Sequence, residues 1–440
     1  YKRQAYTNLG NLAFDEGDLD QAVDLYSQAV VLLSRTGEHR HLSAVQHNLG
    51  LIAIDLGDLG GARNNLIESI RLSRLHGYAM DEAETLTALA DLAQTEGEYQ
   101  EAEELLARAL DLSLESKSRV AEAGIVHSLG LLSLARGDYL KARDLFVDAV
   151  AAYSYLGRPP DVVGVLADLS RTRVAVGDLR GGVRDLQRAR VIADSLSLGP
   201  AHYAELALSE GDLQLALKEY SRAFDLYRSA EDLFSALNSP GGQARALEGQ
   251  GLLNMIREDF EEASGVLAKS MSLRRQSAQP DPRALSITGM YLALAQEEMG
   301  DLAGARRELK DIANTLARLG DGVGEAAVMA SLGELEVRRG DIDSADSLFL
   351  RGLALLKGRI APEVEWRLHA GRADVFQSSD RVDAAIEELR LAIEAAERVG
   401  YGLPLEEGNR VRAGHSDLYI RLAERLVRDG QIEAAFELAE

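Results

Sequence analysis

The feature that most constrains this chain is a pattern that returns every 40 residues. In the first copy, Gly10 is followed seven residues later by Gly17-Asp18 and five residues further on by Ala22. The pattern returns four more times at the same spacing, with its paired residues at Gly57-Asp58, Gly97-Glu98, Gly137-Asp138 and Gly177-Asp178. Such a period indicates a repeat architecture, in which each unit packs mainly against its two neighbours.

The second half of the chain carries the pattern less regularly. We interpret Gly211-Asp212 as the next turn, 34 residues after Gly177, and Glu258-Asp259 as the following one, 47 residues later. Irregular spacing is therefore predicted over residues 178–258. The pattern then continues at Gly300-Asp301, Gly340-Asp341, Asp380-Arg381 and Gly430-Gln431, the last of these after a step of 50 residues.

Each copy predicts two helices joined by a tight turn. Apolar residues recur at helical intervals before the pair, as at Tyr6 and Leu9, and again after it, as at Leu25 and Ala29. Glycine favours the left-handed backbone that ends a helix, and the following Asp suits the cap of the next one. Small residues such as Gly10 and Ala22 are expected where the two helices cross. The predicted fold is therefore all-α, a right-handed α-solenoid of about eleven helix–turn–helix repeats of ~40 residues.

The boundaries follow from the spacing. We expect residues 1–400 to form the tandem array and residues 401–410 to form an inserted loop, because Gly402 and Pro404 lie there. Residues 411–440 are predicted to be a last, truncated repeat that leads to a further C-terminal domain.

Composition limits the kinds of partner. The chain has 71 acidic and 48 basic residues, a formal net charge of −23, and no cysteine. Such an acidic surface repels phosphate backbones and anionic lipids, so we expect neither nucleic-acid nor membrane binding. The absence of cysteine excludes disulfides and thiolate chemistry and suits a cytoplasmic location.

The sequence offers no active site. The eight histidines lack the spacing of metal ligands, and no Ser–His–Asp arrangement stands out. The stretch Gly320-Asp321-Gly322-Val323-Gly324 has the composition of a phosphate-binding loop, but no strand precedes it, so a connector is predicted. We expect no catalytic residues, no metal and no cofactor.

A family resemblance rests on one further position. Four residues past the second small residue lies an aromatic residue or Leu, at Tyr26, Leu66, Leu106, Phe146, Leu186 and Tyr220. This skeleton resembles tetratricopeptide repeats over essentially the whole chain. The period of 40 and the string from Asn8 to Asn11 are similar to the longer-helix branch that includes kinesin light chains, cell-polarity adaptors and many bacterial sensors. The resemblance implies a non-catalytic scaffold that binds a protein or peptide.

The same resemblance implies where the partner binds. The concave face of such an array is lined by the first helix of each repeat, at fixed positions around the small residue. An Asn at these positions suits an extended peptide, because its amide pairs with both N–H and C=O groups. We therefore predict a peptide-binding groove at Asn8, Asn11, His47, Asn48, Asp91, His127, Asp168 and Arg171.

The C-terminal sequence carries a second resemblance. The order of Trp366-Arg367, the helix around Ala384–Arg390 and the closing Ala434–Glu440 looks like the stretch that joins such repeats to a CHAT domain, a caspase-like cysteine peptidase. It implies the recognition and regulatory arm of a fused peptidase. The alternatives are the ligand- or peptide-sensing arm of a bacterial signal-transduction ATPase or transcription activator, or a stand-alone adaptor.

Overall fold

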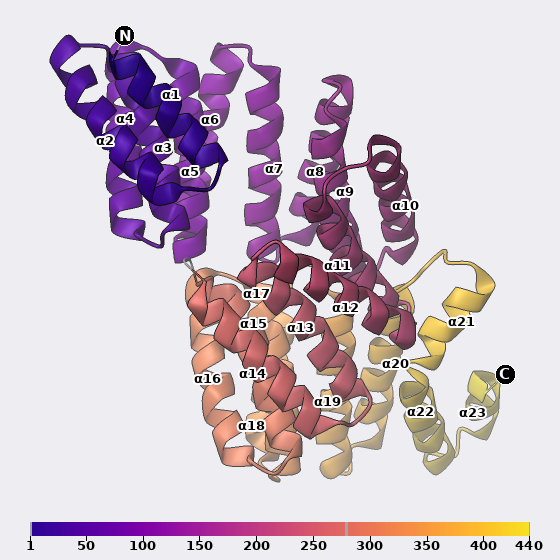
Figure 1. Ribbon diagram of the computed structural model, residues 1–440. Coiled ribbons are helices and arrows are strands. Elements are labelled where there is room, and N and C mark those ends of the chain that lie inside the picture. Colours follow the sequence, from indigo (N-terminus) through magenta and orange to yellow (C-terminus); the bar gives the residue numbers. More distant parts are fainter. Residues whose placement is uncertain (1, 278–279, 440) are drawn as a thin grey trace. The chain divides into compact units, whose positions relative to one another are not determined.

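A computed structural model describes residues 2–277 and 280–439. Within these ranges every regular element is an α-helix, and most helices follow one another as antiparallel pairs (Figure 1). The first twelve are α1 (Lys2–Asp15), α2 (Leu19–Thr36), α3 (His39–Asp55), α4 (Leu59–His76), α5 (Ala79–Glu96), α6 (Tyr99–Glu115), α7 (Arg119–Ala135), α8 (Tyr139–Tyr155), α9 (Pro159–Ala175), α10 (Leu179–Leu196), α11 (Pro200–Ala216) and α12 (Tyr220–Ala236).

The remaining helices complete the array. They are α13 (Pro240–Ile256), α14 (Phe260–Gln276), α15 (Pro282–Glu298), α16 (Leu302–Leu319), α17 (Gly322–Arg338), α18 (Ile342–Leu355), α19 (Pro362–Ser378), α20 (Val382–Arg398), α21 (Leu405–Ala413), α22 (Ser416–Arg428) and α23 (Ile432–Ala439). The predicted all-α fold of stacked helix pairs is confirmed. Among the described helices, only α21 does not form part of such a helix pair.

The chain divides into two compact units. The first unit comprises residues 1–132, 151–157 and 276–282, and the second comprises residues 133–150, 158–275 and 283–440. Each unit is described by itself below.

The predicted turn chemistry is present in most repeats. Gly17, Gly57 and Gly177 have φ values of 79°, 79° and 85°, the left-handed region that glycine adopts without steric cost. The next residue then caps the second helix: Asp58 accepts a hydrogen bond from the Gly61 N–H at 2.9 Å.

One turn assignment is wrong. Gly211 and Asp212 lie inside α11, and the turn follows at Lys218, where φ is 60°. Gly211 is instead the small residue of its repeat, 41 residues after Ser170 and 40 before Gly251, so the irregular spacing predicted over 178–258 disappears. The residue expected at Tyr220 is likewise Tyr227. Lys218 takes the left-handed turn position without being glycine, which hid this turn from the sequence pattern. The turns at Glu258 and Asp380 are left-handed without glycine as well, but the spacing predicted them.

The inserted segment is also more ordered than predicted. A loop was expected over residues 401–410, but α21 begins at Leu405. Acidic residues in its first turn and Arg410 and Arg412 in its last turn complement the helix dipole. Only residues 401–404 of the expected loop precede the helix.

The small residues lie where the paired helices cross, as predicted. A Cβ atom added to Gly10 would lie 2.8 Å from the ring of Tyr26, and one added to Gly50 would lie 2.7 Å from Leu66. The side chains of Tyr26 and Leu66 are fully buried. We call these first-helix positions the crossing residues: Gly10, Gly50, Ala90, Gly130, Ser170, Gly211, Gly251, Ala293, Gly333 and Ala373.

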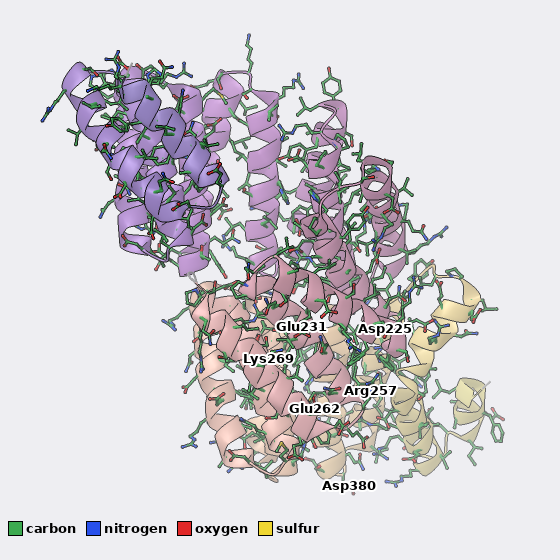
Figure 2. All side chains as sticks on the ribbon, viewed as in Figure 1. Asp225, Glu231, Arg257, Glu262, Lys269 and Asp380 are labelled. Carbon is green, nitrogen blue, oxygen red and sulfur yellow. The ribbon has the colours of Figure 1, made fainter. Side chains whose placement is uncertain are left out.

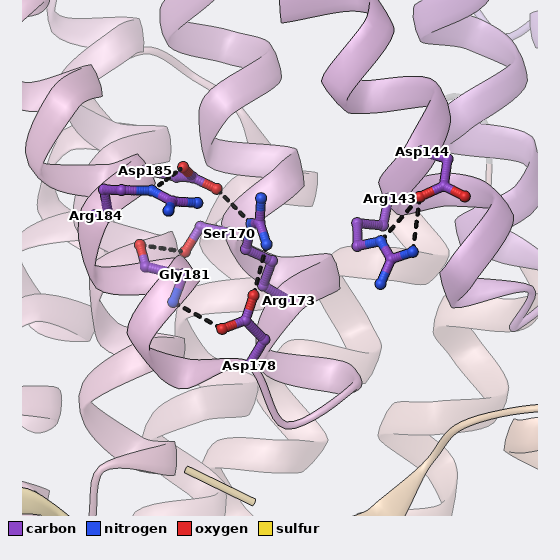
Figure 3. A network of polar contacts seen from close by, with 9 residues as sticks. Arg143, Asp144, Ser170, Arg173, Asp178, Gly181, Arg184 and Asp185 are labelled. Atoms are coloured by element: carbon purple, nitrogen blue, oxygen red, sulfur yellow. Dashed lines mark hydrogen bonds and ion pairs between the residues drawn. The ribbon is translucent and has the colours of Figure 1, made fainter. Parts of the chain in front are cut away.

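A polar clamp fixes the turn between α9 and α10. The guanidinium of Arg173 donates to Asp185 Oδ2 at 2.6 Å and to Asp178 Oδ2 at 2.5 Å. Asp178 also accepts the Gly181 N–H at 2.9 Å, so one carboxylate both caps α10 and holds Arg173 (Figure 3).

Within the second unit the array curls back on itself. The backbone N–H of Gly400 donates to the carbonyl of Gly177 at 2.9 Å, although the two glycines are more than two hundred residues apart. Nearby, Lys218 pairs with Glu363 at 3.9 Å, and Arg410 pairs with Glu219. Turns of early repeats therefore contact connections of much later ones.

Replacing Gly251 with Ala should lower the thermal unfolding midpoint, because the new Cβ would lie 2.6 Å from Leu267 at the crossing. Overpacking of this kind costs about 1–3 kcal/mol. The matched control is Gly265→Ala in α14, where nothing lies within 4 Å of the new Cβ. That change should be neutral or stabilising, since Ala favours helix over Gly by about 1 kcal/mol. Equal midpoints for the two variants would contradict the crossing account.

Candidate functional site

The first helix of each repeat presents one polar face at regular positions. These positions lie six, three and two residues before the crossing residue and one residue after it, which is the spacing of a single helical face. In α3 they are Ala44, His47, Asn48 and Leu51, and in α5 they are Glu84, Thr87, Ala88 and Asp91.

These residues line two adjoining cavities in the first unit. One has a volume of about 440 Å³ and includes Asn48, Asp81 and Thr85. The other, of about 390 Å³, includes Asp91 and Gly124. Both cavities are lined by His47 and Glu84, so they form one continuous surface, which we call the α3–α5–α7 groove.

Two of the predicted asparagines serve the packing of this unit. The hydroxyl of Tyr26 donates to Asn11 Oδ1 at 2.6 Å and accepts from Asn48 Nδ2 at 3.0 Å. The Tyr26 hydroxyl thus brings Asn11 and Asn48 together, and Asn48 also lines the groove. Asn8 is exposed and has no hydrogen bond to the described residues.

The surroundings of His47 disfavour its charged form. Its Nδ1 lies 3.1 Å from the hydroxyl of Thr85. Burial lowers the pKa of the imidazole, and the nearby carboxylate of Asp81 offsets this only in part. Because Nδ1 already bonds to Thr85, Nε2 is the ring nitrogen that remains for a bound chain.

Three carboxylates line the groove, and one of them, Asp81, is paired with Arg40. Neither Glu84 nor Asp91 makes a hydrogen bond or ion pair through its carboxylate with the described residues, although both keep contact with solvent. Desolvation by the groove walls raises the pKa of Asp91 to about 6, against the attraction of His127. Desolvation also raises the pKa of Glu84, with a further contribution from Asp81. The groove therefore holds negative charge that is poorly compensated.

The second unit has a different inner face. Asp168 and Arg171 of α9 pair with each other there. The same polar face continues through α11, α13, α15, α17 and α19, and we call it the inner ladder: Asp168, Arg171, Glu205, Asp212, Arg245, Glu248, Tyr291, Glu334 and Arg367.

Most charges of the inner ladder are already neutralised. Arg245 pairs with Glu205 at 3.0 Å, and Arg367 pairs with Glu334 at 2.8 Å. Glu248 pairs with Arg274 of α14 at 3.0 Å. These groups are half-buried or buried, unlike the surface pair of Lys269 with Glu231, in which the lysine is 58% exposed (Figure 2).

The pKa directions agree with this mutual pairing. Burial works to lower the pKa of Arg171, but the carboxylates of Asp168, Glu205 and Asp212 outweigh it and raise the pKa overall. Burial raises the pKa of Asp212 despite the nearby Arg245, and the Tyr227 hydroxyl donates to this carboxylate at 2.8 Å.

The structure thus separates the predicted residues into groups. His47 and Asn48 line the groove, as does Asp91, with His127 close enough to affect its pKa. Asp168 and Arg171 belong to the inner ladder of the second unit.

Several groove and ladder residues escaped prediction. Extending the same register along the chain points to Asp212, Glu248, Tyr291 and Glu334. Asp212 was hidden because Gly211-Asp212 had been assigned to a turn. Glu84 lies six residues before its crossing residue, a position that the prediction did not include.

The described residues contain no group of three or more His, Cys, Asp or Glu arranged to hold a metal ion. No described helix has the length and apolar composition needed to cross a membrane.

Replacing Asp91 with Asn should raise the thermal midpoint at pH 7.5 and raise it much less at pH 4.5. The folded protein, in which the Asp91 pKa is about 6, holds this proton more tightly than the unfolded chain, where Asp titrates near 3.9. Stability of the wild type therefore falls as pH rises between about 4 and 6, and Asn carries no such cost. A variant that tracks the wild type at both pH values would show that the groove does not desolvate Asp91.

Comparison with known proteins agrees with this architecture. The family model described as tetratricopeptide repeat matches residues 1–75 and 81–155. The chain is 25% identical over 158 residues to the regulatory protein AfsR of Streptomyces griseus, covering 35% of the chain and 16% of that protein. It is 26% identical over 207 residues to AfsR of Streptomyces coelicolor, covering 46% and 20%. The chain thus spans a fifth or less of these relatives.

Among solved structures, a Rap protein complexed with competence and sporulation factor aligns with a TM-score of 0.54 and 12% identity, over 82% of this chain and 96% of that one. At this identity the likeness concerns the fold alone. Helical repeats of this kind are typically non-catalytic scaffolds. The tetratricopeptide repeat model matches about a third of the chain, at its N-terminal end, and paired helices continue beyond the matched residues as far as α23.

Proposed function

We propose that the α3–α5–α7 groove binds an extended peptide segment of a partner protein, and that the chain is the non-catalytic recognition arm of a larger regulatory protein. The observation that carries this proposal is the continuity of the groove. Its two cavities share His47 and Glu84, so the surface extends without a break over three repeats.

The chemistry of the groove suits a peptide. An extended chain brings unpaired N–H and C=O groups that must find partners when they leave water. Asn48 and the imidazole of His47 offer donors and acceptors for them. Gly124 lies on the α7 wall, where an added Cβ atom would lie 3.4 Å from the Tyr153 hydroxyl.

The free carboxylates favour a basic peptide. Glu84 and Asp91 flank an apolar floor that includes Ala88 and Ile125. The stem of a Lys or Arg side chain would lie on this floor, with its charged head between the carboxylates. The net charge of −23 would steer a basic segment toward the chain.

The inner ladder is a weaker candidate for the peptide. Its charges are paired with one another, so a ligand would have to break existing ion pairs before making new ones. We therefore assign Asp168 and Arg171 to the stability of the second unit, and His47, Asn48, Asp91 and His127 to the peptide. Asn8 and Asn11 lie on α1, on the preceding repeat.

The names of the similar proteins support a regulatory role for the chain. Both similar AfsR proteins are named as regulatory proteins, and the aligned Rap protein was solved in complex with competence and sporulation factor. These favour the sensing arm of a regulator over the arm of a CHAT peptidase, which rests on the C-terminal sequence order alone. The neighbouring coding sequence distinguishes the two, by a nucleotide-binding module in one case and a His- and Cys-containing peptidase in the other.

The binding proposal is tested by selecting peptides from a displayed library and measuring the tightest by fluorescence anisotropy. Selected peptides should be rich in Lys and Arg. Glu84→Gln and Asp91→Asn should each weaken binding by about tenfold, the value of a hydrogen bond to a charged group. Binding should also weaken below about pH 6, as Asp91 takes up a proton.

The control is Asp111→Asn, which removes an exposed carboxylate from α6, outside both cavities. It should bind like the wild type. Peptides that bind all three variants equally, or that carry no basic residues, would rule out this groove as the recognition surface.

A further inference from the structure

The second unit contains a cavity on the side of α11 that faces away from the inner ladder. Its volume is about 710 Å³, within the range of roughly 300–1,000 Å³ that is usual for ligand sites. Leu213, Gln214 and Leu217 line it from α11, whereas Glu205 and Asp212 lie on the opposite face of the same helix. The remaining walls come from α10, α12 and the unpaired helix α21.

Helix α21 is what encloses this cavity. It is anchored by the buried side chain of Val411 and by the ion pair of Arg410 with Glu219. Just before it, the Gly400 N–H bonds to the carbonyl of Gly177. The extra helix thus closes a space between α10 and α12 that the repeats alone would leave open.

The floor of the cavity is apolar except for one buried amide. Leu186, Leu213 and Leu217 are 2–4% exposed. Gln214 is 9% exposed and its side chain makes no hydrogen bond to any described residue. The amide faces the cavity, and a ligand that fills the cavity removes it from water, so such a ligand must form hydrogen bonds with it.

In two other repeats a charged residue at the same position is paired within the protein, whereas in α13 the buried side chain of Asn254 also makes no hydrogen bond to a described residue. The equivalent residue in α9 is Arg173, which bonds to Asp185 and Asp178. In α17 it is Glu336, which pairs with Arg306 and Arg339. At Gln214 the cavity takes the place of such a partner.

The charges around the cavity define the ligand further. Arg190 makes a bidentate contact with Glu210, at 3.1 and 2.7 Å, and Arg410 pairs with Glu219, so the charges of these four residues cancel in pairs. Two other charged residues that line the cavity, Arg222 and Glu407, make no ion pair with the described residues. The cavity therefore presents one free positive charge, one free negative charge, the amides of Gln187 and Gln214, and an apolar floor.

We propose that this cavity, the α10–α12–α21 pocket, binds a short apolar peptide with free termini. The peptide carboxylate pairs with Arg222 and its ammonium group with Glu407. Gln214 bonds to the peptide main chain, and apolar side chains cover Leu186 and Leu213. Since α21 closes the pocket, the bound peptide holds α21 against α10 and α12. This site is separate from the α3–α5–α7 groove and stands independently of the function proposed for it.

The test uses the tripeptide Leu-Ala-Leu, titrated into the full chain by calorimetry in three forms: with both termini free, N-acetylated, and C-amidated. In the wild type each modification should weaken binding by about tenfold, because each removes one charge-assisted contact. In Glu407→Gln the acetylated and free forms should bind alike. In Arg222→Gln the amidated and free forms should bind alike.

Two control variants complete the test. Arg228→Gln removes an exposed arginine of α12 outside the pocket and should show the full wild-type pattern. Gln214→Leu should weaken all three forms. Absence of saturable binding to the wild type, or modifications that cost the same in Glu407→Gln and Arg222→Gln as in the wild type, would overturn the proposal. Loss of binding in Asp91→Asn would place the tripeptide in the groove and overturn it as well.

Discussion

The structure depends on a single packing arrangement, in which a large side chain of each second helix fills the space left by a residue with little or no side chain. In the sixth repeat the ring of Tyr227 lies against Gly211 of its own repeat and also against Gly249 of the next one. Phe349 lies in the same way between Gly333 and Gly371. One buried ring therefore sets both the crossing within a repeat and the stacking between repeats.

The same arrangement connects the packing to the concave face. Gly249 occupies the position two residues before its crossing residue, and Asn48 occupies that position in the second repeat. Where the ring belongs to tyrosine, its hydroxyl reaches this face: Tyr26 contacts Asn48, and Tyr227 contacts Asp212. Some polar residues of the face are thus already hydrogen-bonded to the rings beneath them. Glu84 and Asp91 are not, so their side chains are free to bind a partner.

Much of this could be predicted from the sequence, because a period of 40 residues with glycine at the turns admits few folds. The turn made by Lys218 could not, since its left-handed backbone is imposed by the surrounding helices and not by the residue itself. The face was predicted in register for five repeats and then lost at Gly211, where a Gly-Asp pair within a helix imitated a turn. Which polar residues are free and which are paired depends on neighbours 20 to 40 residues away, as for Arg190 with Glu210 or Arg245 with Glu205, and that information is not local.

Photo-crosslinking tests the central claim most directly, namely that recognition takes place on the face formed by the first helices. A benzophenone amino acid would be placed at Ala88 in the groove and, in a second protein, at Asp111 on α6, and each would be irradiated with a partner peptide bound. The account predicts peptide adducts from position 88 and none from position 111. Adducts from position 111 alone would mean that the partner binds the second helices, and the groove would then have no part in recognition.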